Sequence, residues 1–234
     1  MDRLTRKELK SDRFALEVQH SVDYVSEHRR QLIRWVSIAA ALAVVLVGVY
    51  LYREHQHALR QELLAKAFRI QNANVGQPGN EFIQSYSTNA EKMQAANKAF
   101  TELTVRYPGT EEGDIAQYFL ATAAADKGDI QESERRFKVV ADSGNAGYAS
   151  LAKLSLAQIY NSQGKEAEGE KLIRSVIDKP TVFVSKEEAT IALARLMGPA
   201  KPQEARKLLE PLRASERSAV SRAALTALSD IQPK

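Results

Sequence analysis

The chain has 234 residues, with 33 lysines and arginines against 29 aspartates and glutamates, and it contains no cysteine. The lack of cysteine excludes disulfides, thiolate metal sites and cysteine nucleophiles. In residues 53–234 the charges nearly balance, 25 basic against 23 acidic, and the two signs are interspersed. The composition therefore gives no reason to expect nucleic acid as a partner.

Residues 1–34 are charged but carry an apolar periodicity. Phe14, Val18, Val22 and Val25 recur at intervals of four, four and three, which places them on one face of a helix that Ser11 is suited to cap. Two interpretations stay open for this amphipathic tail. It is either an exposed helix that leads into the next segment, or a docking element for a partner or for the membrane surface.

Residues 35–52 read WVSIAAALAVVLVGVYLY and carry no charge over 18 positions. A helix of this length covers roughly 27 Å, close to the thickness of a bilayer core, and it is apolar on every face. Trp35 lies at one end, and Tyr50 and Tyr52 lie at the other, as is typical of membrane interfaces. We expect a permanent transmembrane helix; a cleaved signal peptide and a buried core helix are the alternatives.

The charges beside this segment indicate its orientation. Arg29, Arg30 and Arg34 lie within six residues of its start, whereas Arg53 is the one basic residue equally close to its end. Basic residues near the ends of a span favour the cytoplasm. This predicts a single-pass membrane protein, with residues 1–34 in the cytoplasm and residues 53–234 outside it.

Residues 53–75 are predicted to continue as a helical connector. Leu59, Leu63, Ala67 and Ile70 form an apolar stripe, and Glu62 and Lys66 form a favourable i,i+4 pair. Gly76, Pro78 and Gly79 cannot continue a helix, so residues 76–88 are expected to be a hinge and loop. No long run alternates with period two, and TVFV at 181–184 is expected to be a loop.

Two stretches match at a constant offset of 36 residues, between positions 113 and 179. The sequence LATAAADKG from Leu120 corresponds to LAQIYNSQG from Leu156, and a fixed period in the mid-thirties is typical of helical repeats. The matched glycines are suited to end a first helix in a left-handed turn, and small residues, Ser133 and Gly169, fall where a second helix crosses it. The residues that define the repeat are Leu120, Ala121, Gly128, Phe137, Leu156, Ala157, Gly164 and Ile173.

These positions resemble the tetratricopeptide repeat, and LAQIYNSQG matches its Leu-Ala, Tyr and Gly positions. A weaker copy contains Ala96, Phe100, Leu103 and Pro108, and another contains Leu193, Ala194, Ala205, Leu209 and Leu212. Residues 215–231 are expected to form a last helix that closes the stack. The resemblance implies an α-solenoid of helix hairpins in residues 89–234. Together with the N-terminal transmembrane helix predicted above, this gives an all-α fold.

The order of parts, and residues 15–56 above all, is similar to the YfgM-type family of ancillary subunits of the bacterial SecYEG translocon. This resemblance implies a scaffold of the bacterial inner membrane with its C-terminal domain in the periplasm, whose partners are Sec translocon subunits and periplasmic chaperones or their clients. The tail is longer than that family leads us to expect. Two alternatives stay open: a scaffold for envelope assembly or cell division without translocon contact, and a membrane-bound regulator that acts through its cytoplasmic tail.

The sequence offers little for catalysis. His55 and His57 are two residues apart and do not share a helix face, and Glu111, Glu112 and Asp114 suit the start of a helix better than an acid–base site. No phosphate loop, nucleophile elbow or HExxH motif occurs. We therefore expect no enzyme, no cofactor and no metal.

Repeat arrays of this kind bind proteins on a concave surface lined by the first helix of each pair. Tyr160 is equally a core candidate of its own repeat, and the exposed ends of such arrays permit homo-oligomers. The repeat alignment places six candidate partner-binding residues on or near the concave surface: Gln117, Tyr118, Ala124, Lys153, Tyr160 and Arg195.

Overall fold

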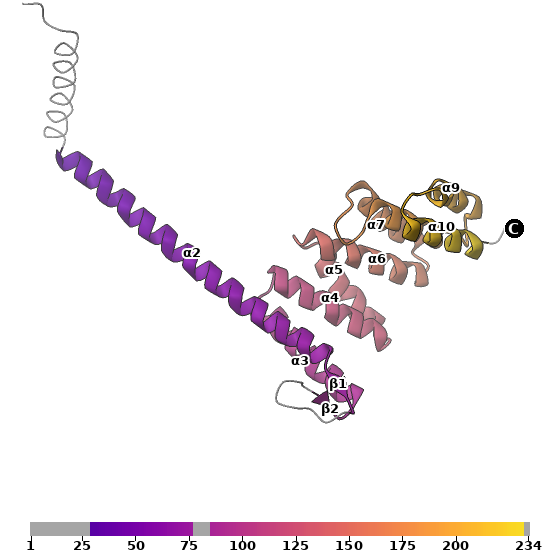
Figure 1. The fold of residues 1–234 in the computed structure, drawn as a ribbon, viewed down its shortest axis with the longest axis horizontal. Coiled ribbons are helices and arrows are strands. Elements are labelled where there is room, and N and C mark those ends of the chain that lie inside the picture. Colours follow the sequence, from indigo (N-terminus) through magenta and orange to yellow (C-terminus); the bar gives the residue numbers. More distant parts are fainter. Residues whose placement is uncertain (1–28, 77–84, 232–234) are drawn as a thin grey trace, which may run out of the picture. The chain divides into compact units, whose positions relative to one another are not determined.

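The computed structural model describes residues 29–76 and 85–231, which are almost entirely helical (Figure 1). Residues 1–28, which include the predicted tail helix, and residues 77–84 of the predicted hinge lie outside the described part. The described chain divides into two units, residues up to Ala58 and residues from Leu59 onward, and each is described by itself below.

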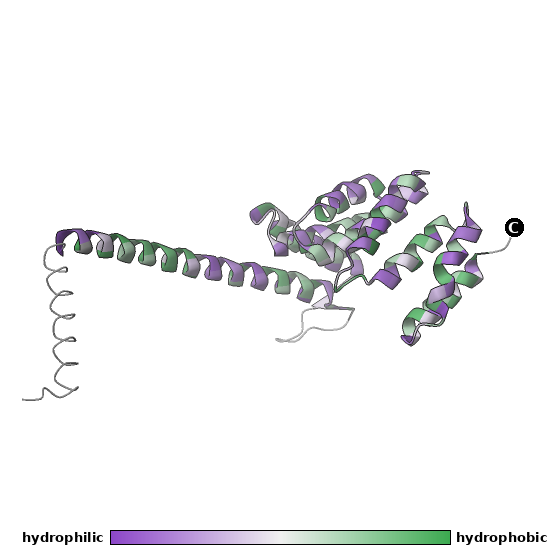
Figure 2. Ribbon diagram, turned by 90° about the horizontal axis from the view of Figure 1, so that it is seen from above, coloured by the Kyte–Doolittle hydropathy of each residue, from purple (hydrophilic) through white to green (hydrophobic). Residues whose placement is uncertain are grey.

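The first unit is the N-terminal part of helix α2 (Arg29–Gln71). The whole of α2 contains the predicted span, residues 35–52, and residues 53–71 of the predicted connector in one uninterrupted helix. Its large apolar side chains are exposed; Leu46 and Val44, for example, are 68% and 72% accessible. Figure 2 shows this hydrophobic stretch of α2. Within the described residues, α2 is the one helix that is long and apolar enough to cross a membrane.

The second unit begins with the C-terminal end of α2 and continues as eight helices joined by short turns. Each helix contacts the next along the chain, and α4 contacts α6, α6 contacts α8, and α8 contacts α10. This is the neighbour-to-neighbour packing of a helical solenoid. The helices are α3 (Asn89–Arg106), α4 (Glu111–Asp126), α5 (Ile130–Ala141), α6 (Ala146–Ser162), α7 (Glu166–Asp178), α8 (Lys186–Met197), α9 (Pro202–Arg213) and α10 (Ser218–Asp230).

Side-chain caps explain where many of these helices begin. Thr88, Thr110, Asp129, Asn145 and Ser185 each precede a helix, and the side chain of each accepts a hydrogen bond from a backbone N–H in the first turn. Such caps satisfy donors that have no partner within the helix. The acidic residues Glu111, Glu112 and Asp114 follow one of these caps, in the first turn of α4. Negative charge there interacts favourably with the positive end of the helix dipole.

The buried residues agree with the predicted repeats. Leu120, Ala121 and Phe137 in one copy, and Leu156, Ala157 and Ile173 in the next, are at most 7% exposed. In the weaker copies, Ala96, Phe100 and Leu103 are buried in α3, as are Leu193, Ala194, Ala205 and Leu209 in α8 and α9. Leu212 is half-buried and Pro108 is exposed. The turn at 181–184 is a loop, and the final helix is α10.

Two features differ from the sequence-based expectations. Two short strands, β1 (Asn74–Val75) and β2 (Ser85–Tyr86), pair in parallel. Strand β1 lies at the end of the predicted helical connector, residues 53–75, and β2 lies in the predicted hinge and loop, residues 76–88. The compact repeat unit also begins at Leu59, thirty residues before the predicted boundary at 89. The reason is that Leu63, Leu64, Ala67, Phe68 and Ile70 of α2 join one apolar cluster with residues of α3 and α4.

Candidate protein-binding surface

The two central repeats have the same turn between their helices. Gly128 and Gly164 have φ angles of +78° and +74°, a left-handed conformation that only glycine adopts at no steric cost. The Gly128 N–H donates to Ala125 O and the Asp129 N–H donates to Ala124 O, and Gly164 and Lys165 make the matching bonds to Asn161 O and Tyr160 O. Both turns are therefore Schellman motifs, and they fix the angle at which each hairpin folds back.

Aromatic rings run from helix to helix through the first half of the repeat unit. Phe68 of α2 lies edge-on to Phe119 of α4, with ring centroids 4.9 Å apart, and Tyr118 of α4 lies 5.3 Å from Tyr148 of α6. Tyr148 in turn lies edge-on to Phe183 of the α7–α8 loop, at 5.3 Å. Such pairs add stability beyond the area they bury. Tyr118, Phe119 and Tyr148 are half-buried and Phe183 is 48% exposed, so part of this row faces outward.

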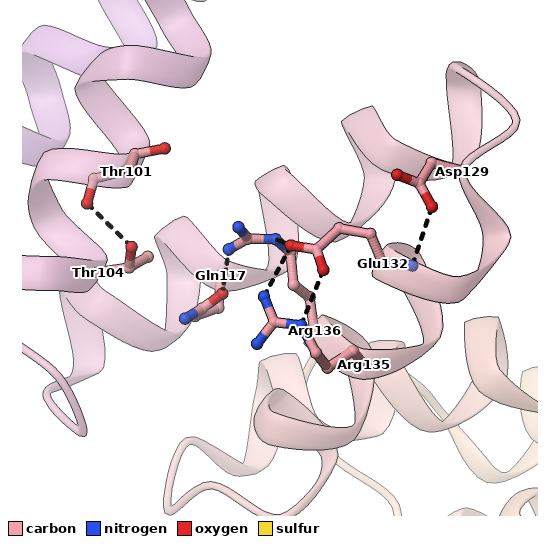
Figure 3. Close-up of polar contacts among 7 residues, drawn as sticks. All are labelled: Thr101, Thr104, Gln117, Asp129, Glu132, Arg135 and Arg136. Atoms are coloured by element: carbon pink, nitrogen blue, oxygen red, sulfur yellow. Dashed lines mark hydrogen bonds and ion pairs between the residues drawn. The ribbon is translucent and has the colours of Figure 1, made fainter.

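A polar network joins α4 to α5 (Figure 3). Arg136 donates to Gln117 Oε1 at 2.7 Å and to Glu132 Oε1 at 2.6 Å, and Arg135 reaches the same carboxylate. The hydrogen bond from Arg135, reinforced by the charge of Arg136, lowers the pKa of Glu132 to about 2. The predicted surface residue Gln117 is thus engaged with α5 inside its own hairpin.

A cavity of about 400 Å³ lies between the ends of α5 and α7 and the start of α6. Its wall contains mostly small side chains, such as Ala149 and Ser150, together with the charged residues Lys153, Asp178 and Lys179. In residues 29–76 and 85–231, no hydrogen bond or ion pair involves the Lys153 ammonium group. Lys153 belongs to α6, and its side chain lies in the wall of the cavity that α6 shares with the ends of α5 and α7.

A second cavity, of about 330 Å³, lies beside the first turn of α4 and is lined by Glu111, Asp114 and Asn145. Asp114 is 5% exposed. Burial raises the pKa of its carboxyl group above the usual value, and Glu111 adds to this, although a hydrogen bond with Ser143 works in the opposite direction. The α4 N-terminus thus holds a carboxylate whose ionised form the fold disfavours.

All six predicted binding residues lie on α4, α6 and α8, of which α4 contacts α6 and α6 contacts α8. Tyr118 lies in the aromatic row, and Tyr160 is approached by the ammonium groups of Lys138 and Lys165, at 5.7 and 5.6 Å from its ring centroid. Ala124 is buried in α4 and offers little surface to a partner, whereas Arg195 is exposed on α8. The residues selected from the sequence do not include Phe119, Tyr148, Val182 or Phe183; the available signal was the aromatic residues in the middle of α4 and in the first turn of α6.

The described residues offer no arrangement of three histidine, aspartate or glutamate side chains that could hold a metal ion. Among their carboxylates, Glu112 is buried and forms an ion pair with Arg60 at 2.9 Å. The features of the repeat unit that a partner protein could contact are the half-exposed aromatic rings, the exposed turn at 181–184 and the two cavities described above.

Residues 30–207 match the family model described as a tetratricopeptide repeat-like domain. No curated protein and no solved structure matched the chain in the corresponding searches. The family match spans well over half of the 234 residues and agrees with the repeated helix hairpins described above, whose typical role is to bind proteins rather than to catalyse reactions. The chain therefore belongs to the tetratricopeptide repeat-like domain family.

Proposed function

We propose that this protein is a membrane-anchored scaffold whose repeat domain binds other proteins at the bacterial cell envelope, as an ancillary subunit of the Sec translocon. The family supports the scaffold role, because stacked helix hairpins present extended surfaces to partner proteins. The anchor and the translocon are the more specific parts of this proposal, and each has its own support and its own test.

The observation that carries the anchor is the exposure of residues 35–52. Their apolar side chains cover every face of α2, and none of the most apolar 18-residue window is buried against other residues of the protein. Leaving so many apolar side chains in water is unfavourable, whereas a bilayer removes that cost. The basic cluster at Arg29, Arg30 and Arg34 supports a cytoplasmic N-terminus and a periplasmic repeat domain.

Anchor and orientation are tested together in bacterial membranes. We expect the full chain to stay in the membrane pellet after alkaline carbonate washing. A reporter that is active only in the periplasm, fused after Lys234, should be active, and the same reporter fused before Met1 should be silent. Release of the intact chain by carbonate would remove the anchor from the proposal, and the opposite reporter pattern would reverse the orientation.

The translocon is supported by the resemblance of residues 15–56 and by the order of the parts, and it is tested by association. The full chain, extracted in a mild detergent, should co-purify with the channel subunits of the translocon and with periplasmic chaperones. A chain with residues 35–52 replaced by an unrelated transmembrane segment is the control for contacts that require the native span. Co-purification with division or envelope-assembly proteins alone, or with cytoplasmic regulators alone, would contradict the translocon role.

A further inference from the structure

The α7–α8 loop and the cavity beside it have features that the repeat fold does not require. The loop is ordered by three hydrogen bonds: Thr181 N–H to Val184 O at 2.9 Å, Val184 N–H to Thr181 Oγ1 at 3.1 Å, and the hydroxyl pair of Ser150 and Thr181 at 2.7 Å. Val184 is fully buried and anchors the turn. The conformation of the turn is therefore fixed from both sides.

This fixed turn presents two apolar side chains to solvent. Val182 is 100% exposed and Phe183 is 48% exposed. Phe183 lies over Gly147 of α6, where an added Cβ atom would come within 2.6 Å of the ring, and its edge meets Tyr148. A single exposed apolar residue is common on protein surfaces. Val182 and Phe183, however, are adjacent on an ordered turn, and Phe183 contacts the ring of Tyr148, so together they form an apolar patch that a partner can cover.

The cavity of about 400 Å³ begins at the same turn, since Thr181 is part of its wall. Lys153 and Lys179 contribute two positive charges and Asp178 contributes one negative charge, and none of the three has an ion-pair partner among the described residues. The Lys153 side chain is partly buried in this wall. A partly buried ammonium group without a counter-ion is stabilised by an incoming carboxylate.

We propose that this turn and cavity form a docking site for an acidic segment of a partner protein. In this arrangement an aspartate or glutamate side chain of the partner enters the cavity toward Lys153 and Lys179, and a neighbouring apolar side chain covers Val182 and Phe183. This proposal rests on the scaffold role proposed above and adds a location and a chemistry to it. The location lies between successive hairpins, at the ends of α5 and α7.

The test uses the full chain in lipid nanodiscs as bait for a phage-displayed library of twelve-residue peptides, with empty nanodiscs removing lipid binders. Enriched peptides should combine an acidic residue with a nearby aliphatic or aromatic residue. Fluorescence anisotropy with one such peptide should show binding weakened about tenfold or more by Val182→Asp, and likewise by Lys153→Glu combined with Lys179→Glu.

Two matched variants are the controls. Lys171→Glu changes an exposed lysine of α7, and Val105→Asp changes an exposed valine of α3; both should bind the peptide as the unchanged chain does. The thermal unfolding of all variants is compared by circular dichroism. Gly147→Ala is a second test of the apolar part of the site, because the added Cβ atom displaces Phe183 without altering any charge.

Peptides that lack acidic residues, a library without enriched peptides, or enriched peptides that bind the charge-reversed variant unchanged would overturn the proposal. Self-association of the full chain that Val182→Asp abolishes would also overturn it, because the occupant would then be a second copy. These outcomes leave the proposed function standing if translocon subunits still co-purify. Conversely, loss of that co-purification leaves the peptide result intact.

Discussion

Gly169 lies where α7 crosses α6, and the packing there leaves little room for a side chain. An added Cβ atom would lie 3.0 Å from the backbone oxygen of Ala157 and 3.1 Å from Leu196 Cδ1. We expect Gly169→Val to lower the free energy of unfolding by about 2 kcal/mol, because the added atoms force the helices apart. Chemical denaturation of the full chain in detergent measures this, with Ala167→Val as the control at an exposed position of α7.

Equal stability of the two valine variants would show that the crossing is loosely packed. The equivalent position one repeat earlier, Ser133, is fully buried, so the small residue at the crossing recurs at the offset of 36 positions.

Asp114 predicts a particular dependence of stability on pH. Its pKa is raised in the folded state, first by burial and then by Glu111, so the folded state binds its proton more tightly than the unfolded chain does. The contribution of Asp114 to stability is therefore most favourable in acid and falls as pH rises through the raised pKa. We expect Asp114→Asn to be more stable than the unchanged chain at pH 7, with the difference shrinking toward pH 3.

Denaturation curves at several pH values check this sign. Glu188→Gln is the control, because it removes one negative charge from the first turn of another helix, α8, at an exposed position. An asparagine variant that is less stable at pH 7 would show that attraction between the carboxylate and the α4 N-terminus outweighs the cost of burial.

At the scale of elements, the end of α2 behaves as part of the repeat domain. Arg60 forms an ion pair with Glu112 of α4 at 2.9 Å and lies 6.0 Å from the ring centroid of Tyr107, while Glu112 is 3% exposed. Removing Arg60 leaves a buried carboxylate without this counter-ion. We expect Arg60→Ala to cost about 2 kcal/mol, below the range for fully buried pairs because Arg60 keeps some exposure.

Hydrogen exchange locates that effect. Backbone amides in residues 59–71 should exchange faster in Arg60→Ala than in Arg69→Ala, which removes an exposed arginine of the same helix. Unchanged protection of residues 59–71 would mean that the apolar residues Leu63, Ala67 and Phe68 hold the segment without the ion pair.

The elements also show which parts of the fold the sequence could reveal. The turns at Gly128 and Gly164 and the buried Leu-Ala pairs were predictable, because helix ends and helix–helix contacts impose local residue types at a fixed spacing. The connector was assigned as a helix but not to the repeat unit, because its stripe did not reveal that α3 and α4 would cover it. Periodicity predicts a buried face but not the element that buries it.

The binding surface was less predictable for the same reason. Lys153 and Tyr160 were assigned by their place in the repeat, yet their neighbours come from α5, α7 and the turn before α7. The cavity exists because small residues from separate segments, such as Ala141, Ala149 and Ser175, meet in space. The spacing of residues within one helix cannot predict that small residues from separate helices will meet in this way.

At the scale of the whole repeat domain, stability is expected to be distributed along the stack. The buried apolar residues form separate clusters, one through α2, α3 and α4, one through α4, α5 and α6, and one from α6 to α10. Because each hairpin packs mainly on its neighbours, damage at one end should spread over a limited distance. The last helix, α10, is the place to test this, because it covers α8 and α9.

Ala227 of α10 is fully buried in the last of these clusters, whereas Leu225 on the same helix is 48% exposed. We expect Ala227→Asp to detach α10, because a buried unpaired carboxylate costs about 3 kcal/mol or more. Hydrogen exchange should then accelerate in α8, α9 and α10 while α3, α4 and α5 keep their protection. Leu225→Asp, which places the same charge in solvent, should leave all of these helices protected. Equal acceleration from α3 to α10 in Ala227→Asp would instead show that the repeats unfold as one cooperative body, and the stack would then not tolerate local opening when a partner binds.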